Sequence, residues 1–106
     1  MITVKLYHNQ DGDVYRYHVH NHGDPIVCAA VSILALNTAN SIAALTHLSD
    51  ADYTYIYDET GELNFVVSAH ADQTQDQAAA VLLNSFALGI TGIEQSYPNE
   101  LKLTKH

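Results

Sequence analysis

Cys28 is the only cysteine in this 106-residue chain, and it follows a helix-start signal at Asp24 and Pro25. An aspartate side chain can accept bonds from unpaired first-turn amides, and proline suits the first helical position. A helix from Pro25 places Cys28 in its first turn, where the positive end of the helix dipole favours a thiolate. His22 lies just before the cap. A cysteine with a nearby histidine is the minimum set for thiol nucleophilic catalysis.

The residues around Cys28 leave a second interpretation open. A lone cysteine beside alanine and valine is more often a small buried hydrophobic residue than a nucleophile. Ser32 lies one helical turn beyond Cys28, so its hydroxyl is expected to face the same pocket. Alternatively, Ser32 donates a bond back to the Cys28 carbonyl, as helical serines often do.

A second histidine pattern, His18-x-His20-x-His22, indicates a different chemistry. Alternate residues of a strand share a face, so three imidazoles could converge on one zinc ion and support a hydrolytic site. The alternative is an exposed histidine stripe on a strand. No nearby carboxylate spacing completes a familiar site, and His22 is expected to lie past the strand end. We therefore assign neither a metal nor a cofactor from the sequence.

The composition limits the class of partner. Four basic and 12 acidic residues give a net charge of −8, which disfavours nucleic acid and anionic membranes and would tolerate a basic peptide. One cysteine cannot form an internal disulfide, which fits a cytoplasmic location. The first residues do not resemble a signal peptide, and the alanine-rich stretches, interrupted by polar residues, do not predict a membrane span.

The elements that must position these residues alternate between strands and helices. The pattern predicts a single domain over residues 1–106, an α+β fold with a mostly antiparallel sheet packed against two helices in two layers. On the second strand, Tyr15, Tyr17 and Val19 are expected to face the core, and Val14, Arg16, His18 and His20 the other side. A capping box at Thr74–Gln77 is expected to start the second helix. The predicted order β-β-α-β-β-α-β covers residues 2–7, 14–20, 25–46, 53–57, 63–68, 75–96 and 100–105.

The first predicted helix has no charged residue between Val27 and Leu48. A helix without charge all round is typically buried on more than one side, and a small sheet can cover only one. The other face is therefore expected either to meet a second subunit or to be an exposed polar face of Asn, Ser and Thr. Gly89 and Gly92 in the second helix suggest close helix packing or a loosened end.

The stretch Ile26–Ser32, written Ile-Val-Cys-Ala-Ala-Val-Ser and preceded by Asp24, resembles the ribosomal-processing cysteine protease family, Prp. The resemblance extends over the whole chain, including the hairpins, the helices and a late Ile93–Tyr97 motif. It implies a cysteine endopeptidase that removes a short N-terminal extension from a large-subunit ribosomal protein. It also implies a homodimer, which agrees with the uncharged first helix. The composition, and not the resemblance, leads us to expect a cytoplasmic location and no direct contact with nucleic acid or membrane.

Carried over by position, the resemblance makes Cys28 the nucleophile and His22 its base, with Ser32, Asp24 and Gly23 lining or supporting the site. His20 is the alternative base if the register slips by two residues. The sequence departs from the family pattern in a shorter loop between His22 and Cys28 and in Pro25 after Asp24. It is therefore expected to be a divergent member. The alternatives are an inactive ribosome-associated binding or assembly protein and a histidine-rich zinc-binding protein.

Overall fold

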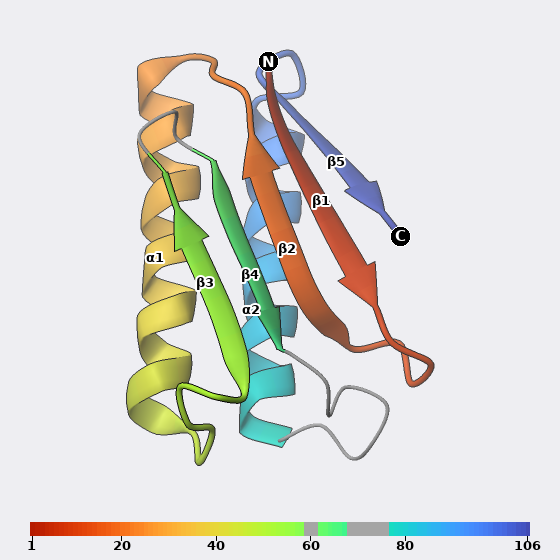
Figure 1. Ribbon diagram of the computed structural model, residues 1–106. Helices are drawn as coiled ribbons and strands as arrows, with labels where there is room; N and C mark the ends of the chain where they lie inside the picture. The colour runs from red at the N-terminus through yellow and green to blue at the C-terminus, as the bar shows by residue number, and fades with distance from the viewer. Residues whose placement is uncertain (59–61, 68–76) are drawn as a thin grey trace.

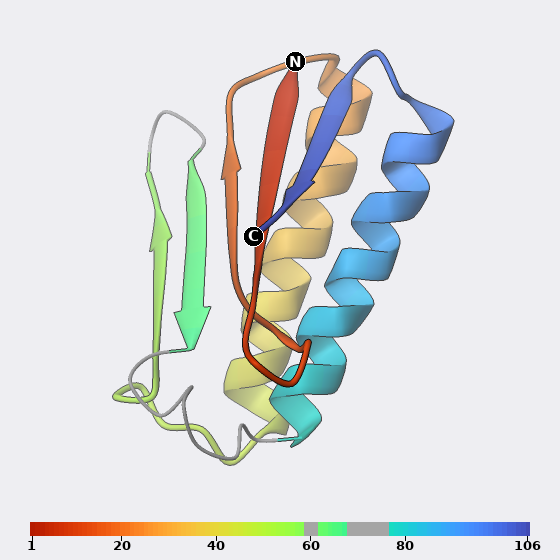
Figure 2. The same ribbon diagram turned by 90° about the vertical axis from the view of Figure 1, so that its right-hand side faces the viewer.

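In residues 1–58, 62–67 and 77–106, which the computed structural model describes, five strands form one sheet and two helices cover one of its faces (Figures 1 and 2). This is the predicted two-layer α+β fold, in the predicted order. The elements are β1 (Ile2–His8), β2 (Val14–His20), α1 (Pro25–Leu45), β3 (Tyr53–Tyr57), β4 (Leu63–Val67), α2 (Gln77–Ser96) and β5 (Leu101–Lys105). The predicted capping-box residue Thr74 and the predicted strand end Ser68 lie outside the described residues.

The strand order across the sheet is β3-β4-β2-β1-β5. The β1/β2, β2/β4 and β3/β4 pairs are antiparallel, and only β1/β5 is parallel. The second hairpin, β3/β4, therefore pairs through β4 with the edge of β2 that faces away from β1. This arrangement leaves β3 and β5 at the two edges and confirms the expectation of a mostly antiparallel sheet.

A bulge corrects the predicted faces of β2. Tyr7 pairs with Arg16 but His8 pairs with Val14, so Tyr15 has no partner in the ladder. The extra residue lets two residues on one strand oppose one on the other and shifts the alternation by one. Val14 is consequently buried, where the sequence placed it outside, and Tyr15 is only partly buried. Beyond the bulge the predicted alternation holds.

The core lies between the sheet and the helices. Tyr17 is fully buried, stacks on Phe65 of β4 and Phe86 of α2, and donates a 2.7 Å bond to the Ala35 carbonyl of α1. This one side chain therefore ties β2 to both helices. Gly89 of α2 lets the two helices approach closely, since a Cβ there would lie 2.9 Å from Cδ1 of Leu34 in α1.

Both helices are long and apolar enough to meet a length-and-composition test for crossing a membrane, with mean hydropathies of 1.8 for α1 and 1.2 for α2. The scattered Asn, Ser and Thr of these helices lower the mean hydropathy less than charged residues would. Core helices of soluble proteins share this length and composition. Each helix here places one face against the sheet.

Candidate active site

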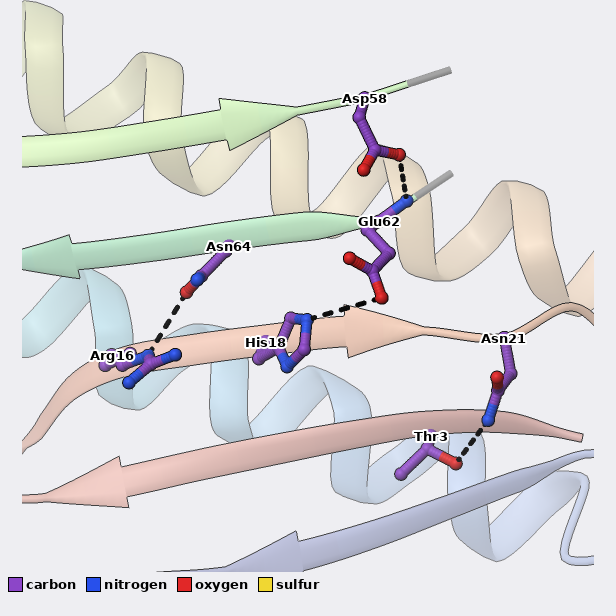
Figure 3. Close-up of polar contacts among 7 residues, drawn as sticks. All are labelled: Thr3, Arg16, His18, Asn21, Asp58, Glu62 and Asn64. Carbon is purple, nitrogen blue, oxygen red and sulfur yellow. Dashed lines mark hydrogen bonds and ion pairs between the residues drawn. The ribbon is translucent and has the colours of Figure 1, made fainter. Parts of the chain in front are cut away.

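The candidate site lies where β2 turns into α1, at the upper end of the sheet in Figure 1. Only four residues, 21–24, make this connection. Asn21 has a φ of 69°, a left-handed conformation that asparagine tolerates better than most residues. The side-chain amide nitrogen of Asn21, Nδ2, donates to the Thr3 hydroxyl at 3.4 Å (Figure 3). The strand therefore ends abruptly at Asn21, and the chain turns toward the helix layer.

The connection is fixed to neighbouring elements through the backbone. The Met1 amine donates to the His22 carbonyl at 3.0 Å, and the Asp24 amide donates to Glu100 Oε2 at 3.0 Å. Gly23 is pressed against the same neighbours, because a Cβ there would lie 3.2 Å from Ile2 Cγ1 and 3.3 Å from Glu100 Oε2. The predicted supporting residue Gly23 thus has a steric role, the close approach of this loop to β1 and to the start of β5.

Asp24 caps α1 as the sequence predicts. Its Oδ1 accepts the Ile26 amide at 2.9 Å and the Val27 amide at 3.3 Å, and its carbonyl accepts the Cys28 amide at 2.9 Å. The cap starts the helix at Pro25 and so places Cys28 in the first turn. It also occupies the first-turn amides, the groups that a thiol enzyme could otherwise use to stabilise an oxyanion. An oxyanion hole built from them requires the aspartate to release its bonds.

A cavity of about 280 Å³ brings three predicted site residues together. Cys28 and Ser32 reach it from α1 and His22 from the connection. The half-buried Cys28 sulfur also lies 3.9 Å from the Gly23 carbonyl, and His22 is exposed. Among the described residues, its lining comprises Ile2, Val19, Asn21, His22, Cys28, Val31, Ser32 and Tyr57. Cys28, His22 and Ser32 thus line one open cavity of mixed polar and apolar character. A cysteine with a nearby histidine can support nucleophilic attack on a bound carbonyl.

The alternative base, His20, does not line this cavity. Along β2 the buried residues Tyr17 and Val19 face the helices, so His18 and His20 face the opposite side of the sheet. Their rings stand edge to face with centroids 4.8 Å apart. The predicted run of three histidines is therefore divided, with His22 in the cavity and the other two behind the sheet.

His18 has an altered proton affinity on that opposite face. Its Nε2 lies 3.9 Å from Glu62 Oε1 at the start of β4 (Figure 3). Burial lowers the pKa of His18, the neighbouring His20 lowers it further, and Glu62 opposes both. Arg16 and Lys5 add smaller lowering effects. His18 is consequently biased toward the neutral imidazole at neutral pH.

Sequence reasoning missed two contributors to the site. Tyr57 ends an aromatic strand that the sequence predicts only as a sheet element, and it reaches the cavity because β3 runs antiparallel to β4 at the same end. Glu100 anchors both Ile2 and Asp24, at 3.0 Å each, through its carbonyl and its carboxylate. Both roles depend on strand order, for which a single sequence carries no local signal.

Comparison with known proteins gives a family match over nearly the whole chain. The family model described as cysteine protease Prp matches residues 1–102. The solved structure of a Staphylococcus aureus ribosomal processing protease Prp, in complex with a covalently linked product peptide, has a TM-score of 0.84 at 25% identity, with 100% of each chain covered. The same protease with a substrate peptide gives 0.83 at 24%, again over 100% of both chains.

A further solved structure, SMU.848 from Streptococcus mutans, shares the fold with a TM-score of 0.76 at 22% identity, covering 99% of this chain and 93% of that one. A comparison with curated proteins gives no match. The fold and the family model therefore agree over the segment that carries Cys28 and His22.

Proposed function

Because this chain belongs to the Prp family of cysteine proteases, we propose that it is an endopeptidase that removes a short N-terminal extension from a large-subunit ribosomal protein. The observation that carries the proposal is the cavity at the start of α1, which Cys28 and His22 both line. The similar S. aureus protein is described as a ribosomal processing protease and binds a substrate peptide, which supports the same class of substrate here.

In the proposed mechanism, His22 accepts the proton of the Cys28 thiol and the sulfur attacks the scissile carbonyl carbon. The peptide C–N bond then breaks, and the leaving amine takes the proton from His22. The thioester that remains on Cys28 is hydrolysed by water, with His22 accepting a proton from that water. Asp24 holds Cys28 at the helix start through the cap, and Gly23 allows the loop carrying His22 to approach β1.

The cavity walls and the charge of the protein fit a particular kind of substrate. The cavity is lined by the buried Ile2, Val19 and Val31 and by the exposed Tyr57, and this apolar part of its lining suits a hydrophobic or aromatic side chain near the cut. The net charge of −8 favours a peptide with basic residues over nucleic acid. Ribosomal proteins act in the cytoplasm, where a free thiol stays reduced, so we place the reaction there.

We also propose a homodimer that uses the outer face of α1. Ile26, Ile33 and Leu45 are each at least 65% exposed, and α1 carries no charged residue to keep this face in water. Exposed apolar surface of this kind is typical of an interaction site. Sedimentation of the wild type and of Ile33→Asp tests it. A monomeric wild type would exclude the dimer, and the variant is expected to shift the dimer toward monomer.

The direct test of the protease is incubation with the extended ribosomal protein of the same organism, followed by mass spectrometry. The wild type is expected to release one N-terminal peptide, and Cys28→Ala is expected to release none. His22→Ala and His20→Ala, compared at equal concentration, identify the base, with His47→Ala as a control on an exposed histidine outside the cavity. Cleavage by Cys28→Ala, or none by folded wild type, would refute the proposal.

A non-catalytic binding or assembly protein on the same scaffold is the second candidate. The observation that favours it is the occupation of the first-turn amides by Asp24, which leaves them unavailable to an oxyanion. Alkylation of Cys28 by iodoacetamide distinguishes the two. A protease is expected to show rapid alkylation at neutral pH that slows in His22→Ala, whereas a binding protein would show the same slow rate in both.

A further inference from the structure

We propose a second site, separate from the cysteine cavity, in which His18, His20 and Glu62 bind one zinc ion on the face of the sheet that the helices leave uncovered. The three side chains each offer one ligand atom, and these atoms all lie within 4.8 Å of one another. Two imidazoles and one carboxylate are ligand types that zinc prefers, and a fourth position would remain open to water or to a substrate group.

The strand register brings the three ligands together. His18 and His20 are two residues apart on β2 and so share a face. The antiparallel β2/β4 ladder pairs His18 with Asn64 and Val19 with Leu63. Continued by one residue, it sets His20 opposite Glu62. Glu62 therefore reaches across from the neighbouring strand, and a metal bound here would join β2 to β4 at the end of their ladder.

The spacing is close to, but wider than, that of a loaded site. Zinc–ligand bonds of about 2.1 Å in a tetrahedron place ligand atoms about 3.4 Å apart. The His18 Nε2–Glu62 Oε1 separation is 3.9 Å, and the Glu62 side chain is 50% exposed and free to adjust its rotamer. The widest separation among the three ligand atoms is at most 4.8 Å, so it must shrink by about 1.4 Å or less to form the site.

Two features of the surroundings act on metal affinity in opposite directions. Lys5 and Arg16 oppose a dication, since both act electrostatically on His18. The Arg16 guanidinium donates a 3.1 Å bond to Asn64 (Figure 3) and lies 4.6 Å from the centre of the Tyr7 ring. Glu62 supplies the negative charge that offsets part of this repulsion.

The experiment is isothermal titration of the tag-free full chain with zinc chloride at pH 7.5. One zinc per chain is expected, with His18→Ala, His20→Ala and Glu62→Gln each weakening binding at least about 10-fold, since even loss of an outer-shell partner costs 10- to 100-fold. His47→Ala is the matched histidine control and should bind as the wild type does. Circular dichroism of each variant verifies the fold.

Cys28→Ala decides where the metal lies, because a thiol and His22 could also hold zinc. The proposal expects Cys28→Ala to retain full affinity, and cobalt substituted for zinc to show no thiolate-to-cobalt charge-transfer band. Loss of binding in Cys28→Ala with no effect of His18→Ala would place the metal in the cysteine cavity and overturn the proposal. Absence of saturable binding by the wild type would overturn it too, while leaving the protease proposal intact.

Discussion

Replacing Asp24 separates the capping role of its side chain from the effect of its charge on Cys28. Asp24→Ala removes the acceptor of the Ile26 and Val27 amides, whereas Asp24→Asn keeps a carbonyl oxygen in the same place and removes only the charge. The pair of variants therefore isolates two physical effects at one position.

The expected magnitudes follow from the two bonds. Loss of an N-cap acceptor costs about 1 kcal/mol of unfolding free energy, and loss of a negative charge at a helix start costs about 0.3–1 kcal/mol. Asp24→Ala should thus lower the unfolding free energy by about 1.3–2 kcal/mol and Asp24→Asn by about 0.3–1 kcal/mol. In a domain of this size 1 kcal/mol shifts the melting temperature by roughly 4–8 °C, so calorimetry or urea denaturation resolves the difference.

The charge effect appears at the thiol. A carboxylate at the helix start offsets the positive dipole that would stabilise a Cys28 thiolate, so both variants should be alkylated faster than the wild type at neutral pH. If both variants lower the unfolding free energy equally, the charge of Asp24 and not its capping bonds accounts for its contribution to stability. Unchanged alkylation in both would refute the electrostatic link between Asp24 and Cys28.

Two further perturbations test the core and the open face of the sheet. Tyr17→Phe keeps the stacking but loses the bond to the Ala35 carbonyl, so the unfolding free energy should fall by about 1 kcal/mol in urea denaturation; no change would mean that this bond contributes nothing net. The pKa of His18 is lower in the folded chain than its usual 6.5, so the unfolded state takes up the proton first as pH falls. The contribution of His18 to the free energy of unfolding is therefore fully present above pH 6.5 and is lost as the pH falls below that value. His18→Gln should flatten the dependence of the melting temperature on pH between 7 and 5. An unchanged slope would contradict that assignment.

The features that the sequence predicts well are those set by nearby residues. The Asp24-Pro25 signal predicts the start of α1 at the observed residue, because capping involves only the first turn. Ser32 lines the cavity with Cys28 because helical geometry fixes residues four apart on one face. The family resemblance rests on this same local block, and the family match confirms it.

The features that the sequence does not predict depend on pairing between distant strands. The bulge at Tyr15 arises from how the first hairpin closes, and it moves Val14 into the core against the simple alternation. Tyr57 and Glu62 reach the ends of β2 only because β4 pairs with β2 and β3 with β4. Several strand orders fit the same alternating pattern, and they would bring different residues to these positions.

The three histidines of the His18-x-His20-x-His22 run show that regular spacing in the sequence does not determine which site each residue joins. While the chain remains a strand, the two-residue period keeps His18 and His20 on the open face of the sheet. Asn21 then turns left-handed, the period ends, and His22 reaches the cavity on the other side. One residue in an uncommon conformation thus separates His22, which lines the cavity with Cys28, from His18 and His20 on the open face of the sheet. Because the two sets share no side chain, loss of zinc binding in His20→Ala and loss of cleavage in His22→Ala should be separable. Loss of both activities in either variant with its fold intact would mean that Asn21 does not divide the run in solution.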